Sequence, residues 1–383
     1  MAVTRLTVSE FRSYAEARLE TDARPVVLTG PNGAGKTNLL EAVSFLAPGR
    51  GLRRATLAEI RRRAAPPDAA WAVAARLETP QGEVAIGTGT DGQVGDGGAR
   101  RLIRIDGHPA PSQATLGEYV ALVWLTPQMD RLFIEGAGNR RRFLDRLVFG
   151  FHPEHAAALT AYDQAMRDRS RLLRDERDSG RRADPAWLSA LEETMAGNAV
   201  AIAAARVEVV GRLGAAGASG TLADGPFPQA VLDIEGTVEG WLREGPALAA
   251  EEALKARLIA TRRLDGAIGG ASEGPHRSDL LVRHRAKDMP AALCSTGEQK
   301  ALLIGIVLAN ARLLAAERGA APLLLLDEVA AHLDQRRRAA LYEEILALKA
   351  QAWLTGTDRV LFAELGDRAH FVGIEDARIT DFG

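Results

Sequence analysis

The hydrophobic pattern of the chain begins with alternation. Val3–Phe11 places apolar and polar residues in turn, which predicts a strand with one buried face. A strand-like pattern also runs from Trp71 to Ile105, broken by the segment DGQVGDGG at 91–98, and it predicts antiparallel strands joined by a flexible tip. Other short apolar or alternating runs predict further strands. These runs lie at 25–29, 121–125, 231–236, 280–284, 322–326 and 352–355.

A helical period dominates the middle of the chain. Between residues 140 and 264, apolar residues recur at spacings of three, four and seven, which predicts two long amphipathic helices with a coiled-coil-like seam. The charged segment RDERDSGRRADP at 174–185 predicts the turn of a helical hairpin, and a third helix is predicted at 246–266. The expected seam positions are Leu159, Tyr162, Met166 and Leu173 on the first helix, and Trp187, Leu191, Met195, Ile202, Val209 and Leu213 on the second.

Strands and helices alternate on both sides of this region. The apolar spacing predicts helices at 36–46, 300–317 and 336–349, between the short strands. Alternation of this kind is typical of the α/β fold class. We therefore expect one α/β domain formed by residues 1–138 and 268–383, interrupted by an inserted helical domain at 139–267.

The composition and net charge of the chain restrict how it can bind nucleic acid or a membrane. The 383 residues are 46% hydrophobic, which is enough for a large core. A formal net charge of −2 excludes a global attraction to nucleic acid or to an anionic membrane, so DNA binding would need a local basic patch. Arginine clusters are candidates for such a patch, although each could equally be a solvated face. They lie at 61–63, 139–146, 167–182 and 336–338.

Cysteine usage and hydropathy indicate the compartment. Cys294 is the only cysteine, so no intramolecular disulfide can form, which fits a reducing compartment. The N-terminal residues lack the apolar core of a signal peptide. No run approaches the roughly 20 apolar residues needed to span a bilayer. We expect a cytoplasmic protein with no membrane partner.

A glycine-rich segment follows the predicted strand at 25–29 and precedes the predicted helix at 36–46. It matches the pattern G-x-x-x-x-G-K-[ST], whose glycines let backbone N–H groups surround a phosphate. Lys36 can neutralise phosphate oxygens, and the Thr37 hydroxyl can bind Mg²⁺. The predicted ATP-binding residues are Gly30, Pro31, Asn32, Gly33, Ala34, Gly35, Lys36 and Thr37.

Two acids follow four leucines at the end of a predicted buried strand. Ligands of such sheets bind at the carboxyl ends of the strands. Asp327 could hold Mg²⁺ there, directly or through water, and Glu328 could act as general base on an attacking water. Asp334, shortly after, could cap the next helix or contact a second subunit, and both roles stay open.

The segment CSTGEQK at 294–300 lies directly before an apolar helix. An ordinary helix start explains part of it, with Ser295 or Thr296 as N-cap and Glu298 or Gln299 completing a capping box. A helix start with a small hydroxyl and a glycine is also an anion site. Because Gly30–Thr37 already supply a phosphate site, the anion at Ser295 and Gly297 is expected to belong to another subunit.

Together the three motifs resemble those of the ABC-type ATPases, in the chromosome-maintenance and DNA-repair branch, and more closely those of the RecF family. The family's motifs recur in order along nearly the whole chain. The corresponding segments are Phe11–Tyr14, Thr37–Ala42, Gly49–Arg50, Arg140–Asp145 and Gly274–Leu280. This resemblance implies a P-loop ATPase head with an inserted helical, coiled-coil-like lobe.

The resemblance also implies roles for single residues. Lys36, Asp327 and Glu328 would be catalytic, with Glu328 as the base. Gln128 would contact ATP and Mg²⁺ in a loop that senses the γ-phosphate, and Thr37 and Asp327 would complete the metal site. Ser295, Gly297, Glu298 and Gln299 would form the signature that acts on ATP bound to the partner subunit.

The sequence departs from family patterns in three places. A threonine of the segment 353–358 stands where transporter ATPases have a histidine, which predicts slow hydrolysis because a hydroxyl carries no positive charge. Ser278 replaces an acid, so the role of that position stays open. Thr296 and Glu298 make the signature poorer in glycine than that of transporters.

The implied function is that of an ATP-dependent DNA-binding recombination mediator. It would act in DNA repair at gaps, in replication restart and in the SOS response, on single-stranded or gapped DNA and with other mediator proteins. ATP-driven homodimerisation would clamp DNA, and weak ATP hydrolysis would release it. The alternatives are the ATPase subunit of a transport system and a non-enzymatic, ATP-gated adaptor.

Overall fold

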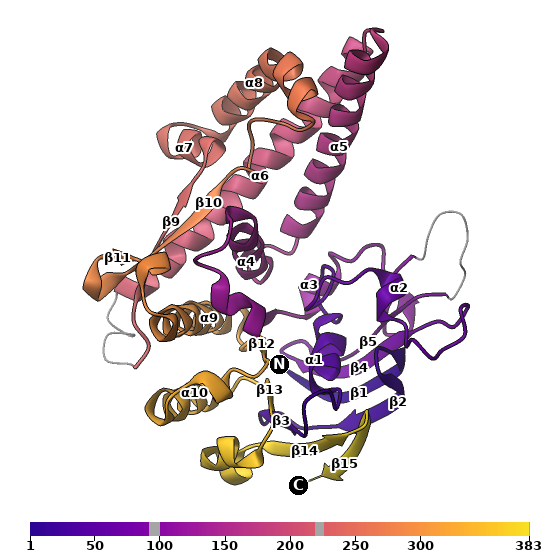
Figure 1. Cartoon of the computed structure of the whole chain (residues 1–383), viewed down its shortest axis with the longest axis vertical. Coiled ribbons are helices and arrows are strands. Elements are labelled where there is room, and N and C mark those ends of the chain that lie inside the picture. The colour runs from indigo at the N-terminus through magenta and orange to yellow at the C-terminus, as the bar shows by residue number, and fades with distance from the viewer. Residues whose placement is uncertain (92–99, 219–225, 383) are drawn as a thin grey trace. The chain divides into compact units, whose positions relative to one another are not determined.

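The computed structural model describes residues 1–91, 100–218 and 226–382 and divides the chain into two compact units (Figure 1). Unit 1 contains residues 1–130, residues 226–228 and the chain from Ser295 onward. Unit 2 contains the residues from Arg131 to 218 and Gln229–Cys294. Residues 268–294, which the hydrophobic pattern assigned to the α/β domain, therefore lie in unit 2. The tip predicted at 91–98 lies outside the described residues, except for its first residue.

The first sheet of unit 1 is antiparallel, with the strand order β2-β1-β4-β5-β6-β7. Its strands are β1 (Ala2–Phe11), β2 (Tyr14–Glu20), β4 (Ala72–Thr79), β5 (Gly82–Gly89), β6 (Leu102–Ile105) and β7 (His108–Pro109). Alternate residues such as Leu6 and Val8 are buried, as the period of two predicts. Their core also includes Leu39 and Val43 of helix α1 (Lys36–Ser44).

The second sheet of unit 1 carries the predicted short strands, in the order β15-β14-β3-β13-β12-β8. The strands from β14 to β8 pair in parallel. All of these except β14 are almost completely buried, which explains their continuous apolar sequence. The strands are β3 (Val26–Thr29), β8 (Leu122–Leu125), β12 (Leu323–Leu326), β13 (Ala352–Gly356), β14 (His370–Glu375) and β15 (Arg378–Phe382). The hydrophobic pattern did not predict β14 and β15.

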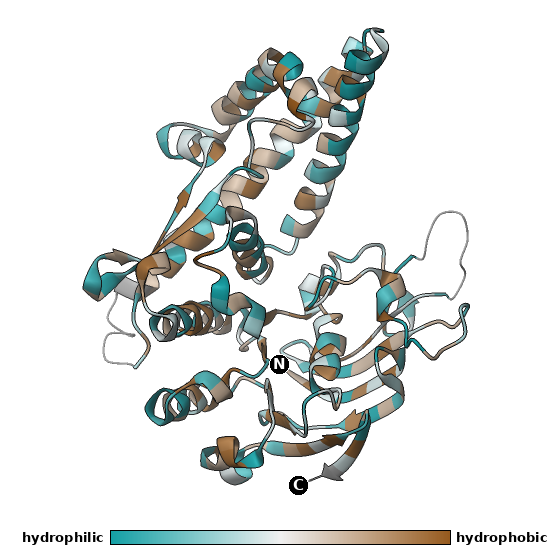
Figure 2. Ribbon diagram, viewed as in Figure 1, coloured by the Kyte–Doolittle hydropathy of each residue, from teal (hydrophilic) through white to brown (hydrophobic). Residues whose placement is uncertain are grey.

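Helix α9 (Thr296–Arg318) corrects one expectation from the sequence. It is long enough, and with a mean hydropathy of 1.4 over 18 residues apolar enough, to pass as a membrane span among the described residues. Within the structure, 72% of that window is buried. Helix α9 belongs to unit 1, and hydrophobic residues are buried on nearly every face of it, which gives the helix the composition of a span (Figure 2). Helix α10 (Gln335–Ala347) follows in the same unit.

Unit 2 combines long helices with a three-stranded sheet of order β11-β10-β9. The predicted long helices are confirmed as α5 (His155–Ser179) and α6 (Pro185–Ala218). Helix α8 (Ala247–Ile268) shares their core through Leu254 and Leu258, so the pair is not an isolated hairpin. The other elements are α4 (Ala137–Phe149), α7 (Thr237–Glu244), β9 (Ala230–Glu235), β10 (Asp279–His284) and β11 (Met289–Pro290).

The seam of α6 begins one residue later than its spacing suggests. Trp187, an expected seam residue, is 49% exposed, whereas Leu188 is 2% exposed. One residue corresponds to a rotation of about 100° on a helix, so Leu188 and Met195, seven apart, share the buried face instead. The prediction for Trp187 was therefore wrong because periodicity alone does not fix which of two adjacent apolar residues faces the core.

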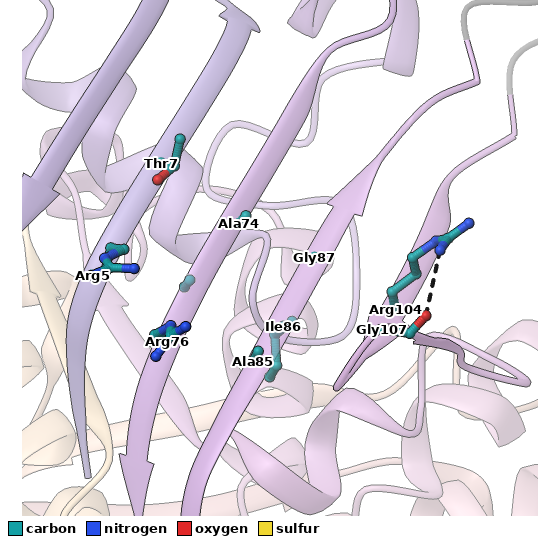
Figure 3. A pocket seen from close by; sticks show the side chains of 10 residues that line it. Arg5, Thr7, Ala74, Arg76, Ala85, Ile86, Gly87, Arg104 and Gly107 are labelled. Carbon is teal, nitrogen blue, oxygen red and sulfur yellow. Dashed lines mark hydrogen bonds between the residues drawn. The ribbon is translucent and has the colours of Figure 1, made fainter.

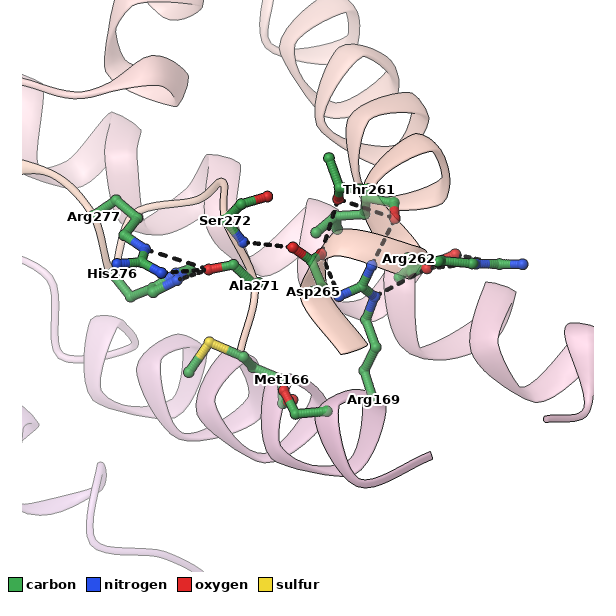
Figure 4. Close-up of polar contacts among 12 residues, drawn as sticks. Met166, Arg169, Thr261, Arg262, Asp265, Ala271, Ser272, His276 and Arg277 are labelled. Carbon is green, nitrogen blue, oxygen red and sulfur yellow. Dashed lines mark hydrogen bonds and ion pairs between the residues drawn. The ribbon is translucent and has the colours of Figure 1, made fainter. Parts of the chain in front are cut away.

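A buried ionic network joins three helices of unit 2 (Figure 4). Arg169 of α5 has no exposed surface and donates hydrogen bonds to Glu192 of α6 over 3.0 Å and to Asp265 of α8 over 2.8 Å. It also donates to the carbonyl of Leu258 over 2.6 Å. Both acids are buried as well. Buried charges of this kind are tolerated only when paired, and Arg169 thus links the three helices through its partners.

Candidate active site

The loop Gly30–Thr37 has the backbone geometry of a phosphate cradle. Gly30, Gly33 and Gly35 have φ values of 150°, 82° and 111°, which L side chains rarely adopt. A Cβ on Gly30 would lie 2.0 Å from the carbonyl oxygen of Ile374. One on Gly35 would lie 2.7 Å from the Tyr14 hydroxyl. The loop therefore requires glycine at these positions, and it opens into α1, whose first N–H groups favour an anion.

Lys36, the first residue of α1, holds its ammonium group at this loop. Its Nζ donates to the carbonyl oxygens of Gly30 over 2.6 Å and Pro31 over 2.9 Å. Burial lowers the pKa of Lys36 from its ordinary value, while the charges of Glu328 and Asp327 oppose that shift. The arrangement places one cation and two carboxylates together at the carboxyl edge of the second sheet.

Residues of the turn between β1 and β2 form hydrogen bonds with the loop and with α1. The Tyr14 hydroxyl donates to the carbonyl of Gly35 over 3.2 Å, and Ser13 Oγ accepts from Asn38 over 2.8 Å. Arg12 forms two hydrogen bonds, of 2.6 and 2.8 Å, with the buried carboxylate of Glu41 on α1. The resemblance marked Phe11–Tyr14 without giving it a role. Its polar residues hold the helix that follows the cradle.

The two acids after β12 lie next to the cradle. Thr37 Oγ1 donates to Asp327 Oδ1 over 2.9 Å, and Thr355 Oγ1 of β13 donates to the same oxygen over 2.8 Å. The backbone N–H of Glu328 donates to Thr355 Oγ1 over 2.8 Å. Asp327 is 5% exposed, and Glu328 has the left-handed φ of 53°. Sequence motifs supplied Thr37 and both acids, but nothing in the sequence singled out Thr355 for this contact.

Gln128 lies at the same sheet edge as Asp327. It is an exposed residue of the 3₁₀ turn Pro127–Arg131, which follows β8. Strand β8 pairs with β12, and the N–H of Asp327 donates to the carbonyl of Leu125 over 2.9 Å. The fold thus brings Gln128 and Asp327 to neighbouring strand ends, 199 positions apart in the chain.

The segment Ser295–Gln299 starts α9 with a capping box. Ser295 is the N-cap, its hydroxyl donates to Glu298 over 2.9 Å, and its N–H donates to the same carboxylate over 3.0 Å. Arg337 of α10 donates to the carbonyl of Gly297 over 3.3 Å. Of the two N-cap candidates, Ser295 is thus the observed one. Gln299 is buried, whereas Ser295, Gly297 and Glu298 are not.

Two positions left open by the sequence have defined contacts. Asp334 is the N-cap of α10 and accepts from the N–H of Arg337 over 2.9 Å. Ser278 is fully buried and donates to the Glu239 carboxylate over 2.7 and 2.8 Å. An acid at position 278 would face that carboxylate with like charge, so a serine suits this buried position of unit 2.

Several arginines of the candidate clusters are paired with acids of their own unit. Arg140 is paired with Asp279 over 2.7 Å, Arg62 with Glu10 over 2.7 Å, and Arg171 with Asp168 over 3.0 Å. Arg169, within the cluster at 167–182, is buried in the network described above. The clusters at 139–146 and 167–182 therefore offer fewer cations to DNA than their sequences suggest.

A depression of about 310 Å³ lies on the open face of the first sheet (Figure 3). Small residues such as Ala74 and Gly87 form its floor, and Arg5, Arg76 and Arg104 stand around it. Glu20 accepts from Arg5 and Glu83 from Arg76, so two of these charges are compensated. The depression has no lining residue in common with the cradle or the acid pair.

The donor set at the cradle fits a nucleotide with Mg²⁺. No group of three or more His, Cys, Asp or Glu side chains that could hold a metal occurs in the described part of the chain. Mg²⁺ bound with phosphates usually takes only one or two carboxylates or hydroxyls from the protein. Thr37 and Asp327, in contact beside Lys36 and the cradle, provide such a set.

Comparison with known proteins finds similarity over nearly the whole chain. Residues 2–378 match the family model for the RecF/RecN/SMC N terminal domain. The DNA replication and repair protein RecF of Rhizobium meliloti (strain 1021) is 50% identical, over 99% of this chain and 98% of that protein. The protein of the same name from Caulobacter vibrioides is also 50% identical, with the same shares covered.

Solved structures agree in fold. The recombination mediator protein RecF-ATP in the RecFOR pathway superposes with a TM-score of 0.83 at 21% identity, over 100% of this chain and 97% of that one. An Smc head domain from Pyrococcus furiosus gives a TM-score of 0.53 at 17% identity, over 99% of this chain and 95% of that one. The fold is thus that of an ATPase head with an insertion.

Proposed function

This chain belongs to the RecF family, and we propose that it is an ATP-dependent, DNA-binding recombination mediator with weak ATPase activity. It would act in the cytoplasm, in DNA repair at gaps, in replication restart and in the SOS response, together with other mediator proteins. Support for the biological role comes from relatives named DNA replication and repair protein RecF, at about half identity over the full chain. That family assignment disfavours a transport ATPase subunit.

The observation that carries the biochemical proposal is the contact of Thr37 with Asp327 beside the glycine cradle. Bound ATP would supply the phosphoanhydride bond, and Mg²⁺ would neutralise charge on its phosphates. Residues Gly30–Thr37 would bind the phosphates, with Lys36 as the cation, and Thr37, Asp327 and Gln128 would hold the metal. The Glu328 carboxylate would orient water and accept its proton.

The signature role of Ser295, Gly297, Glu298 and Gln299 requires a second subunit. A capped helix start that presents N–H groups and a small hydroxyl suits an anion. The chain's own phosphate cradle opens α1, whereas this segment opens α9. We propose that it meets the γ-phosphate of ATP bound to a partner copy, so that ATP drives homodimerisation and the dimer clamps DNA.

The test compares wild type with Glu328→Gln, which removes the base but keeps side-chain shape. Solution mass, ATP turnover and DNA binding are measured with and without ATP and Mg²⁺. We expect an ATP-dependent dimer that binds DNA, slow turnover by wild type, and a long-lived dimer with turnover reduced at least about 100-fold in the variant. Equal turnover would exclude Glu328 as the base, and absence of ATP-dependent DNA binding would exclude the clamp.

A non-enzymatic adaptor is distinguished by the same measurements. It would dimerise and bind DNA with ATP, but wild type and Glu328→Gln would show the same dimer lifetime. Both variants would then also lack turnover above the background rate.

A further inference from the structure

Thr355 occupies the central strand between the two halves of the candidate site. Strand β13 pairs with β3, which leads into the cradle, and with β12, which leads into the acids. Thr355 is opposite Leu28 in that register and lies one residue before the end of β13. Its side chain is therefore at the carboxyl edge of the sheet, where the ligand is expected.

The hydroxyl of Thr355 donates its only proton to one acid of the pair and accepts a hydrogen bond from the backbone of the other. It donates to Asp327 Oδ1 over 2.8 Å and accepts the N–H of Glu328 over 2.8 Å. Thr355 is 1% exposed, so water does not compete for either bond. Removing a buried hydroxyl that forms two hydrogen bonds is costly, because both of its partners then lose a hydrogen bond away from solvent.

Glu328 adopts a conformation that needs such an anchor. Its φ of 53° is left-handed, which costs a non-glycine residue roughly 1–2 kcal/mol. Its N–H is the group that Thr355 accepts. The left-handed residue turns the chain directly after Asp327 and so sets where the Glu328 side chain begins. Strained residues of this kind persist when their surroundings determine them, and they cluster at functional sites.

The resemblance to transporter ATPases assigned a threonine of 353–358 to the place of a phosphate-binding histidine. The segment contains two threonines with different surroundings. Thr355 is buried and occupied by the acid pair, whereas Thr357, just beyond the strand, is exposed. A phosphate contact is thus open only to Thr357, and Thr355 needs another role.

We propose that Thr355 is a positioning residue that fixes both acids with one hydroxyl, Asp327 through its carboxylate and Glu328 through its backbone. This inference rests on the proposed ATPase function. Thr37 donates to the same Asp327 oxygen as Thr355. This one carboxylate oxygen therefore links α1, which follows the cradle, to β13, whose Thr355 holds the backbone of Glu328. The assignment goes beyond the phosphate-loop, acid and signature roles proposed above.

The test replaces Thr355 by valine, which keeps the shape and removes the hydroxyl, and by serine, which keeps the hydroxyl. The serine variant is the matched control at the same position. We expect Thr355→Val to lower kcat about 10- to 100-fold, as for other residues that orient ligands, with KM changed less than about threefold. Thr355→Ser should stay within about threefold of wild type. A wild-type kcat in the valine variant, or an equal loss in the serine variant, overturns the role.

Amide hydrogen exchange at Glu328, without nucleotide, gives a readout that does not depend on hydrolysis. Its N–H should be protected in wild type and Thr355→Ser and should exchange faster in Thr355→Val. Equal protection in all three overturns the link. If the exchange pattern holds but wild type shows no turnover, the proposed ATPase function fails instead. If Thr355→Val does not fold, Thr355→Cys replaces it, and a wild-type kcat in that variant likewise overturns the proposal.

Discussion

The hydroxyl of Thr37 donates to Oδ1 of Asp327 over 2.9 Å, although the two residues are 290 positions apart in the chain. Thr37 lies on α1, which follows β3 through the cradle, and Asp327 directly follows β12, with only β13 between these two parallel strands. The contact joins the cradle and the acid pair into one site. Its loss should affect Mg²⁺-dependent steps before it affects folding.

We therefore predict that Thr37→Val weakens ATP binding in the presence of Mg²⁺ by about tenfold or more, because a hydroxyl ligand is lost. Binding without Mg²⁺ should change much less. Thr37→Ser is the matched control, since the motif accepts either hydroxyl. Titration with a fluorescent ATP analogue, with Mg²⁺ or with EDTA, measures both. Equal weakening with and without the metal would contradict a metal-binding role for Thr37.

The capping box at Ser295 allows the cap and the signature to be separated. Ser295→Ala removes the hydroxyl that bonds Glu298 and should lower the free energy of unfolding by about 1 kcal/mol. Ser295→Arg also fills the space in front of the helix. It should leave ATP binding by the monomer intact and abolish ATP-dependent dimerisation and hydrolysis. Analytical ultracentrifugation measures dimerisation, and ATP titration measures binding by the monomer. Loss of ATP binding by the Ser295→Arg monomer would show that the segment acts within its own subunit and not on a partner.

The Arg169 network predicts a large stability effect in unit 2. Arg169→Met leaves Glu192 and Asp265 with fewer partners in a buried site and should lower the free energy of unfolding by about 3–5 kcal/mol. Arg171→Met, two residues along the same helix, breaks only a solvent-exposed pair with Asp168 and should cost less than about 1 kcal/mol. Urea unfolding followed by circular dichroism measures both. Similar losses would show that the network is not a main support of the helices.

His276 predicts a dependence of stability on pH. Its Nε2 lies 2.9 Å from the carbonyl of Ala271, and its Nδ1 lies 2.7 Å from the Tyr162 hydroxyl. Burial lowers the pKa of His276 below its ordinary value of 6.5. The hydrogen bond with the Ala271 carbonyl and the charge of Asp265 oppose this shift, and the charges of Arg277 and Arg141 add to it. Below about pH 6.5 the unfolded chain thus binds more protons at this residue, so its contribution falls as pH falls.

His276→Gln should accordingly flatten the loss of stability between pH 6.5 and 5. Above pH 7 the two curves should run parallel, which serves as the internal control. Chemical unfolding at half-unit intervals of pH measures the difference. A variant whose curve keeps the wild-type slope below pH 6.5 would show that His276 is not one of the groups responsible.

Much of the candidate site could be predicted because its motifs are local. The glycine positions in Gly30–Thr37 follow from backbone angles that only a few consecutive residues determine. The acid pair and the capping box at Ser295 likewise depend on a strand end and a helix start that the hydrophobic pattern places. Motif order along the chain then indicated the family.

Other features were decided by packing between distant segments. The sequence showed two threonines at 355 and 357, but only the alignment of β13 beside β12 determines which of them reaches Asp327. The apolar composition of α9 is that of a membrane span, and only its burial in the folded structure shows that protein surrounds it.

Packing between distant segments also decides that Leu188 is buried and Trp187 is not, and that Arg169 is buried while nearby arginines are exposed. Residue types and spacing determined the local backbone and the chemistry available, because these depend on a few neighbouring residues. The tertiary structure alone decided which side chains lose water and which partner each one meets. The free energy of burial depends on surfaces brought together from across the chain, and a local pattern does not contain that information.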